Sequence, residues 1–335
     1  MSRARASAVS VTIKTSVCAP PAPASARFLF PFPFPFRSRF CLRFRFRDHR
    51  PMSSAVSPSH LASAIERVQS PASGVQVDVV YSTHSKWPQP TAGSSAGHAL
   101  RVSVLDSSFN PPTRAHLALA RTAPQGAHRS SEYDAHLLLF SVRNVDKTLK
   151  LGDASPVQRL QMMIHLARDL ESHLSSPNVA VAVIDEPTFV GKATKLLAHF
   201  HNASIHPAPL LTFIVGYDTL TRLFAPQYYP PERTPASMRT AVKQFFWPGG
   251  ANSSVVCARR PTAGGDANPD EKAFLESADV AGYVRVGKIR LVDISDEERH
   301  ISSTAVRNGV AAGSKDWEKM CTPSIVEFVR NLNVL

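Results

Sequence analysis

Segment 107–116 reads Ser-Ser-Phe-Asn-Pro-Pro-Thr-Arg-Ala-His, and it brings hydroxyl groups, an imidazole and turn-forming prolines together within ten residues. It follows the apolar run Arg101–Leu105, and its paired prolines predict a tight turn between a strand and a helix that begins near Thr113. A helix N-terminus offers unpaired N–H groups and a partial positive charge, so it attracts anions. Thr113 and His116 lie three residues apart and share a helix face. We therefore expect this turn to hold a phosphate.

A second segment with related features, 301–307, lies near the C-terminus and reads Ile-Ser-Ser-Thr-Ala-Val-Arg. The hydroxyls of Ser302, Ser303 and Thr304 can cap a helix and also donate to phosphate oxygens. Arg307 lies one turn along the same face, where its guanidinium can bind phosphate. An ordinary turn with an N-cap and a surface histidine would explain the first segment taken alone, and an ordinary hydroxyl-rich helix cap would explain the second. Two such segments in one chain favour a nucleotide site.

Strand and helix signals alternate from residue 100 onward. The predicted strands are Arg101–Leu105, His136–Val142, Val179–Ile184, Leu210–Val215, Ser254–Ala258 and Lys288–Ile294. The predicted helices are Arg114–Arg121, Ser155–Glu171, Lys192–His199, Asp218–Phe224, Ser237–Phe246 and two closing helices after Ser303 and Pro323. This alternation predicts an α/β fold, a Rossmann-like doubly wound parallel sheet in a single domain with a disordered N-terminal tail. In such sheets ligands bind at the carboxyl ends of the strands.

The helix predicted to begin at Ser155 and Pro156 has a core face of its own. Leu160, Met163, Ile164 and Ala167 repeat at helical spacing, which is typical of residues packed against a sheet. Arg159 lies one turn from the helix start. It is either a surface residue or a side chain that reaches toward the strand ends.

Three regions differ in composition. Residues 1–51 are a low-complexity tail rich in Arg, Phe and Pro, whose alternating prolines block both helix and central strand. Residues 52–99 read as a short helix, His60–Val68, followed by a linker rich in Pro, Gly and Ser. Residues 100–335 hold the alternating strands and helices of the predicted α/β domain. The tail is either disordered or a targeting segment, and Met52 is an alternative start of the chain.

Charge and cysteine usage narrow the class of protein. The chain carries a net charge of +12, but its first 51 residues hold ten Lys and Arg and one acid, so the remainder is only mildly basic. That balance suits small anionic nucleotides rather than nucleic acid as partners. No apolar run reaches the roughly 18 residues of a membrane span. The four cysteines lack zinc or disulfide spacing. A cytoplasmic or nuclear location is expected, with mitochondrial import through the tail as the alternative.

The two phosphate-binding candidates together resemble known signatures. Segment 107–116 resembles the (H/T)xxH motif of the nucleotidyltransferase superfamily, and segment 301–307 resembles its ISSTxxR motif. The detailed similarity is to nicotinamide mononucleotide adenylyltransferases, in particular a divergent fungal branch. Weaker similarity extends through 144–147, 216–219, 222–224, 228–229 and 257–259. The resemblance covers roughly residues 100–335.

This resemblance implies adenylyl transfer from ATP to nicotinamide mononucleotide, giving NAD⁺ and pyrophosphate. Mg²⁺ would be bound mainly by ATP phosphates and water. His116 and Thr113 would donate to the reacting phosphates, and Lys147, or Lys150 in another register, would contact phosphate. The outer phosphates would be held by Ser302, Ser303, Thr304 and Arg307. The nucleotide would contact the turn residues Ser107, Ser108, Phe109 and Asn110, and its ribose would contact Gly216 and Asp218.

Two departures from the family pattern concern the path of the loop at Ser107 and the pocket for the pyridine ring. Ser107 stands where most members have glycine, and the tryptophan that often stacks on the pyridine is missing. Possible substitutes are Phe224, Tyr228, Tyr229 and Trp247. The choice between nicotinamide and nicotinic acid mononucleotides and the oligomeric state stay undetermined. Alternative functions are a pantetheine-phosphate adenylyltransferase or cytidylyltransferase of the same fold, an ATP hydrolase, and a nucleotide-binding interaction protein without turnover.

Overall fold

The computed structural model describes residues 56–90, 98–122, 133–143, 152–259 and 269–332. Residues Ser54–Leu335 form one compact unit. The predicted low-complexity tail, residues 1–51, lies outside the described residues. Within the described ranges, no helix has both the length and the apolar character needed to cross a membrane.

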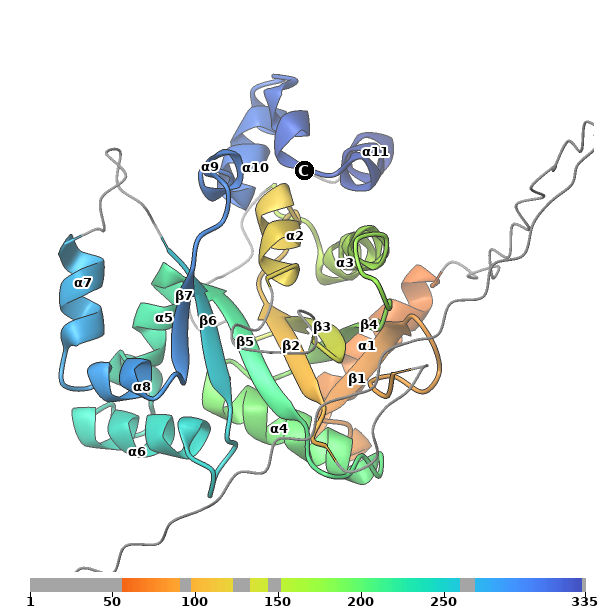
Figure 1. The fold of residues 1–335 in the computed structure, drawn as a ribbon. Helices are drawn as coiled ribbons and strands as arrows, with labels where there is room; N and C mark the ends of the chain where they lie inside the picture. The colour runs from red at the N-terminus through yellow and green to blue at the C-terminus, as the bar shows by residue number, and fades with distance from the viewer. Residues whose placement is uncertain (1–55, 91–97, 123–132, 144–151, 260–268, 333–335) are drawn as a thin grey trace, which may run out of the picture. The chain divides into compact units, whose positions relative to one another are not determined.

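A seven-stranded sheet forms the centre of this unit (Figure 1). Its strands are β1 (Val77–Ser82), β2 (Arg101–Asp106), β3 (Ala135–Ser141), β4 (Val179–Ile184), β5 (Leu210–Gly216), β6 (Ser254–Ala258) and β7 (Ile289–Val292). Their spatial order is β1-β4-β3-β2-β5-β6-β7, and every neighbouring pair is parallel except β1 with β4. Without β1, this is the strand order of a doubly wound Rossmann-type sheet, whose topological switch point lies between β2 and β5. The predicted fold class is confirmed.

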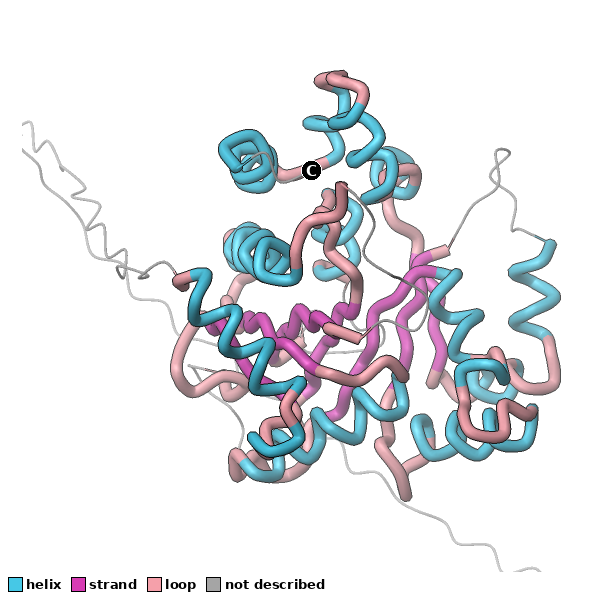
Figure 2. Tube along the Cα trace, turned by 180° about the vertical axis from the view of Figure 1, so that it is seen from behind, coloured by secondary structure: helices cyan, strands magenta, loops and turns pink. Residues whose placement is uncertain are grey.

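Helices cover both faces of the sheet (Figure 2). The helices are α1 (Pro58–Gln69), α2 (Arg114–Ala120), α3 (Pro156–Glu171), α4 (Phe189–Asn202), α5 (Tyr217–Leu223), α6 (Pro235–Phe246), α7 (Pro269–Glu276), α8 (Ala281–Arg285), α9 (Asp296–Arg299), α10 (Ser303–Ala311) and α11 (Pro323–Leu332). Short 3₁₀ turns are η1 (Pro71–Ser73), η2 (Pro226–Tyr228) and η3 (Asp316–Met320).

Two hydrophobic clusters hold the layers together. One packs α1, α2 and α3 on the sheet, and the other packs α4, α5 and α6 on its opposite face. Strand β4 supplies both, because Val181 and Val183 join the first cluster while Ala182 and Ile184 join the second. A third cluster joins α10, η3 and α11 to α3. The predicted core stripe of α3 is buried throughout.

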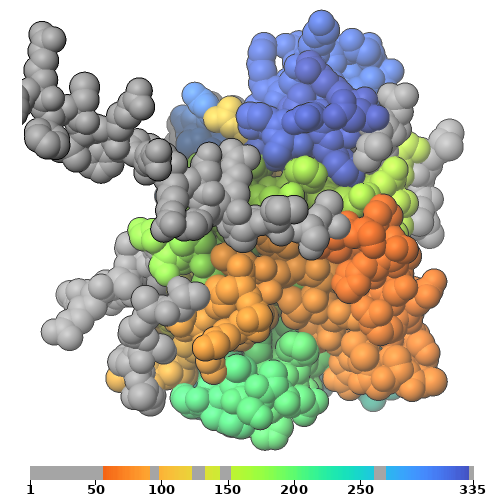
Figure 3. Space-filling view, turned by 90° about the vertical axis from the view of Figure 1, so that its right-hand side faces the viewer, coloured from red at the N-terminus to blue at the C-terminus, as the bar shows by residue number. Residues whose placement is uncertain are grey.

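One strand lies where the sequence predicts a linker. Strand β1 pairs antiparallel with β4 at the sheet edge, and Figure 3 views this side of the molecule, with the segment from α1 through β1 in orange. Arg67 of α1 donates to Asp78 of β1 at 2.7 Å, and Leu61 and Ala64 of α1 are fully buried. The segment therefore belongs to the folded unit. The neighbouring Gly, Pro and Ser residues hide a strand of only six residues from sequence reading.

Candidate active site

A cavity of about 600 Å³ opens at the sheet end where β2, β3 and β4 finish. Its lining includes Asp106, Ser107, Ser108, Asn110, Phe140, Ser141, Val142, Arg143, Asp153, Pro156, Arg159, Pro187, Thr188, Phe189, Lys192, Thr219, Arg222, Leu223, Tyr228, Tyr229, Thr304 and Arg307. Five of these residues are basic and two are acidic, which gives the cavity a positive balance. It lies at the switch point, where doubly wound sheets bind ligands.

The turn between β2 and α2 is anchored by two buried side chains. Phe109, in the left-handed region with φ 44°, is fully buried in the cluster beneath α2 and α3. Asn110 donates to Asp153 at 2.6 Å and accepts from the N–H of Ala154 at 3.0 Å. Phe109 therefore anchors the turn in the core, while Ser107, Ser108 and Asn110 face the cavity.

The imidazole of His116 has a defined tautomer. The backbone N–H of Thr113 lies 3.1 Å from Nδ1, and the Thr113 hydroxyl lies 2.8 Å from the same atom. A backbone N–H can only donate, so Nδ1 accepts and Nε2 carries the proton in the neutral ring. Nε2 therefore donates to Oγ of Ser107, at 3.0 Å. Thr113, predicted to touch phosphate, is 1% exposed and instead orients His116.

Burial lowers the pKa of His116 to about 4, although the residue keeps intermediate solvent exposure. The ring is therefore neutral at pH 7. His116 does not itself line the cavity, whereas Ser107 does. A ligand in the cavity thus meets the Ser107 hydroxyl first, with His116 one hydrogen bond behind it.

The start of α10 lies against the same turn. Ser303 donates to the carbonyl of Pro111 at 2.8 Å, and Nη1 of Arg307 donates to the carbonyl of Asn110 at 2.5 Å. Ser302 is the N-cap of α10, as its hydroxyl accepts from the N–H of Ala305 at 3.1 Å. Of the four residues predicted to hold the outer phosphates, Thr304 and Arg307 line the cavity. Ser302 and Ser303 position the helix that carries them.

Asp153 connects three parts of the site. Its Oδ1 accepts from Asn110 and lies 3.4 Å from Nε of Arg307, while its Oδ2 lies 3.7 Å from a guanidinium nitrogen of Arg159. Burial lowers the pKa of Arg159, Asp153 opposes that shift, and Arg307 adds to it. The carboxylate therefore holds two guanidinium groups together at the cavity wall. Arg159 reaches the strand ends, the second of its two predicted positions.

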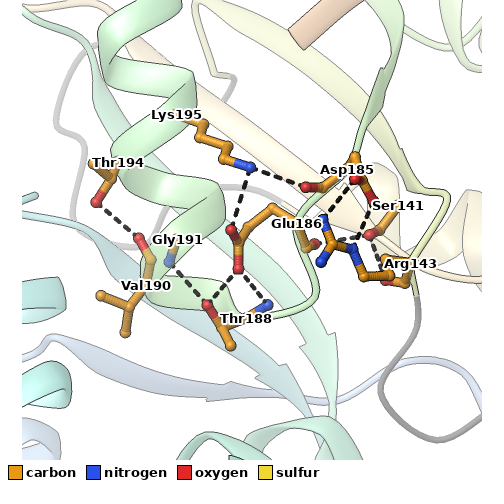
Figure 4. Close-up of polar contacts among 9 residues, drawn as sticks. All are labelled: Ser141, Arg143, Asp185, Glu186, Thr188, Val190, Gly191, Thr194 and Lys195. Atoms are coloured by element: carbon orange, nitrogen blue, oxygen red, sulfur yellow. Dashed lines mark hydrogen bonds and ion pairs between the residues drawn. The ribbon is translucent and has the colours of Figure 1, made fainter. Parts of the chain in front are cut away.

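Polar contacts build the opposite wall, at the ends of β3 and β4 (Figure 4). Arg143 makes a bidentate ion pair with Asp185, at 2.6 and 2.9 Å. Glu186 accepts from the Thr188 hydroxyl at 2.7 Å, and Thr188 caps α4 by accepting from the N–H of Gly191. A Cβ on Gly191 would lie 2.3 Å from the Glu186 carboxyl carbon, so only glycine lets this carboxylate lie over the first turn of α4.

A buried ion pair also lines the cavity. Nζ of Lys192, on α4, lies 2.5 Å from Oδ2 of Asp106, the last residue of β2. The two side chains keep 6% and 9% of their area exposed. Nζ also lies 5.0 Å from the ring centroid of Phe189, another lining residue.

The remaining predicted residues are placed as follows. Gly216 is the N-cap of α5 and Asp218 is exposed in its first turn, at the end of β5 but outside the cavity lining. Of the aromatic candidates, Tyr228 and Tyr229 line the cavity. Phe224 packs against Phe246 in the core, and Trp247 is 55% exposed beyond α6. Lys147 and Lys150 lie outside the described residues.

Sequence reasoning missed Asp153 and the pair formed by Asp106 and Lys192. Asp153 directly precedes the predicted start of α3, and a carboxylate there reads as an ordinary helix-start residue. Asp106 directly precedes the predicted turn, and this position was the one sequence signal that could have placed it in the site. Its partner is 86 residues away, so the pairing is not readable from spacing.

The strand order and the placement of the cavity define the class: this is a doubly wound α/β protein with a basic pocket at the switch point. No family model matches the chain. It is similar to a Schizosaccharomyces pombe protein provisionally named nicotinamide mononucleotide adenylyltransferase. The two are 26% identical over 228 residues, which cover 66% of this chain and 80% of that protein.

Two solved structures are also similar. Plasmodium falciparum nicotinic acid mononucleotide adenylyltransferase, complexed with APC, is 13% identical with a TM-score of 0.43, over 70% of this chain and 96% of that one. Thermotoga maritima TmcAL, bound with alpha-thio ATP, is 14% identical with a TM-score of 0.33, over 70% of this chain and 56% of that one.

Proposed function

We propose that this protein transfers an adenylyl group from ATP to nicotinamide mononucleotide. The observation that carries the proposal is the placement of Ser107, hydrogen-bonded to His116, and of Arg307 on one basic cavity at the switch point. The resemblance to the Schizosaccharomyces pombe protein supports the choice of reaction and acceptor. The protein is then a nucleotidyltransferase of NAD biosynthesis.

In the proposed reaction, a phosphate oxygen of nicotinamide mononucleotide attacks the α-phosphorus of ATP in line. The new bond joins that oxygen to the α-phosphorus, the bond to the β-phosphate oxygen breaks, and pyrophosphate leaves. No covalent enzyme intermediate is required. The protein aligns two polyanions and neutralises the charge that grows on the leaving group.

Four residues at or beside the cavity have a direct task in this scheme, and Asp153 supports one of them. Nε2–H of His116 donates through the Ser107 hydroxyl, whose own proton is then directed at phosphate. Arg307 binds the outer phosphates by charge-assisted hydrogen bonds, and Asp153 keeps its guanidinium in place. Asp218 accepts from a ribose hydroxyl. Mg²⁺ would be held by the phosphate oxygens of ATP and by water, since Asp106 and Asp153 are already engaged with basic side chains.

The test is incubation with ATP, Mg²⁺ and a panel of acceptors, reading out both pyrophosphate and the coupled product. The panel contains the nicotinamide and nicotinic acid mononucleotides, phosphopantetheine and water alone. Pyrophosphate and NAD⁺ should form in equal amounts with nicotinamide mononucleotide. Arg307→Ala should lose roughly 10²-fold in kcat/KM, whereas Arg239→Ala, in an exposed ion pair outside the cavity lining, should match the wild type. Pyrophosphate release without a coupled product, including release with water alone, would instead identify a hydrolase.

A further inference from the structure

The ion pair between Asp106 and Lys192 has no task in the scheme above, yet both residues line the cavity. Nζ and Oδ2 are 2.5 Å apart, and both side chains are more than nine-tenths buried. A charged pair taken out of water loses hydration that its mutual attraction only partly replaces. The pair therefore adds little to stability, and its position at a ligand cavity favours a role in ligand binding.

The pair has hydrogen-bonding capacity left over. An ammonium group has three donors and a carboxylate has two acceptor oxygens. Within the described part of the chain, Nζ of Lys192 hydrogen-bonds to Asp106 alone, and Oδ1 of Asp106 has no partner. A ligand in the cavity thus meets an ammonium donor and a carboxylate acceptor side by side.

The local structure fixes where this pair lies. The backbone N–H of Lys192 donates to the carbonyl of Thr188 at 2.9 Å in the first turn of α4. Thr188 is itself held by Glu186, as Figure 4 shows. Asp106 ends the central strand β2, immediately before Ser107. The end of β2 and the first turn of α4 therefore hold the pair in place, next to Ser107 of the proposed phosphate site.

We infer that the pair formed by Asp106 and Lys192 selects an acceptor whose ring carries a neutral carboxamide over one that carries a carboxylate. This inference rests on the proposed function and names the acceptor preference of the same site. A carboxamide presents one carbonyl acceptor and an NH₂ donor side by side. The carbonyl accepts a hydrogen bond from Lys192, and the NH₂ donates one to Asp106. An unused donor of Lys192 and the unused oxygen of Asp106 thus both gain a partner, and no charge is added.

A carboxylate fits this pair poorly for two reasons. It has no proton to donate to Asp106, and its charge repels that carboxylate while attracting Lys192. Because the pair is neutral overall, attraction and repulsion largely cancel. The cost of taking the ligand carboxylate out of water then remains uncompensated. The amide is preferred because its polar atoms are fully satisfied.

The test compares kcat/KM for nicotinamide and nicotinic acid mononucleotides in the wild type and in variants, with a thermal melt of each. The wild type should prefer the amide by roughly tenfold or more. Asp106→Asn removes the repelling charge and leaves Lys192 as an unpaired cation. It should shift the amide-to-acid ratio at least about tenfold toward the acid. Asp279→Asn, in an exposed ion pair with Arg239, should leave the ratio unchanged.

A double variant, Asp106→Asn with Lys192→Gln, guards against misfolding because it buries no unpaired charge. It keeps a donor and an acceptor side by side, so it should still prefer the amide. The inference is overturned if the wild type uses both acceptors equally, if Asp106→Asn leaves the ratio unchanged, or if the double variant prefers the acid. Turnover of neither acceptor by the wild type would instead overturn the proposed function and the acceptor preference with it.

Discussion

The backbone N–H of Thr113 donates to Nδ1 of His116 at 3.1 Å, and this contact places the imidazole proton on Nε2. Nε2 then faces Ser107, the residue through which the ring reaches the cavity. The (H/T)xxH spacing therefore does more than put two donors on one helix face. Its first residue sets the tautomer of its last.

Replacement of His116 by Ala should lower kcat by about 10²–10³-fold while the KM for ATP changes little, because the donor acts on charge that develops in the transition state. His116→Asn is the matched variant, since its amide oxygen can still accept from Thr113 while the donor toward Ser107 is lost. It should fold like the wild type and be comparably slow. The control is His60→Ala, at an exposed position on α1. Turnover of His116→Ala near the wild-type rate would rule out the proposed role.

The low pKa of His116 makes stability depend on pH. Burial lowers this pKa to about 4 from a reference of 6.5, so between these values the unfolded chain binds more protons than the folded one. Stability from this residue is complete above pH 6.5 and is lost as pH falls toward 4. The loss is at most about 3 kcal/mol, reduced by the partial exposure of the ring. Urea unfolding of the wild type and of His116→Asn from pH 7 to 4 measures this loss. The same pH dependence of the unfolding free energy in both proteins would contradict the prediction.

Ser107 should be needed for full activity, although most members of the family that the sequence resembles have glycine at this position. Because its hydroxyl lies between His116 and the cavity, Ser107→Ala should lower kcat by roughly tenfold and leave ATP binding almost unchanged. Ser107→Gly opens space for the ligand to approach Nε2 directly, so it should recover part of the rate. Steady-state kinetics of both variants decide the matter. Equal activity of Ser107→Ala and wild type would mean that the hydroxyl only fills space.

Asp153→Asn tests whether one carboxylate organises the basic wall. The substitution keeps the shape but removes the charge between Arg159 and Arg307. We expect a destabilisation of about 1–3 kcal/mol and a KM for ATP raised roughly tenfold, because both guanidinium groups lose their anchor. Asp279→Asn should leave the KM unchanged. Tighter ATP binding by Asp153→Asn would show that the carboxylate opposes the nucleotide.

The strands and their order of succession could be predicted because they are continuous apolar runs between turn residues. Val179–Ile184 and Ser254–Ala258 match the structure residue for residue. Helices α7, α8 and α9 were missed, as was β1, because they are short and lack a long apolar period. Helices α7 and α8 instead pack their partly buried apolar side chains against the core cluster beneath α4, α5 and α6.

The candidate site was predictable where a motif is local, as for His116 and the cap of α10. It was not predictable where function depends on distant pairing. Asp106 and Lys192 come from different elements, and Asp153 meets Arg307 only once α10 has docked on the turn. Spacing also could not show that Thr113 faces His116 instead of the cavity, since both directions are open to an N-cap side chain.

Asp218→Ala separates nucleotide binding from chemistry. A ribose contact is equally strong in the ground and transition states, so its loss should raise the KM for ATP with little change in kcat. Gly216, not Asp218, is the N-cap of α5, so this substitution removes no helix cap. Some stability is still at stake, since an acid in the first turn of a helix is worth roughly 0.3–1 kcal/mol. A thermal melt of Asp218→Ala beside the kinetics accounts for this contribution to stability. A collapse of kcat at unchanged KM would assign Asp218 to the chemical step instead.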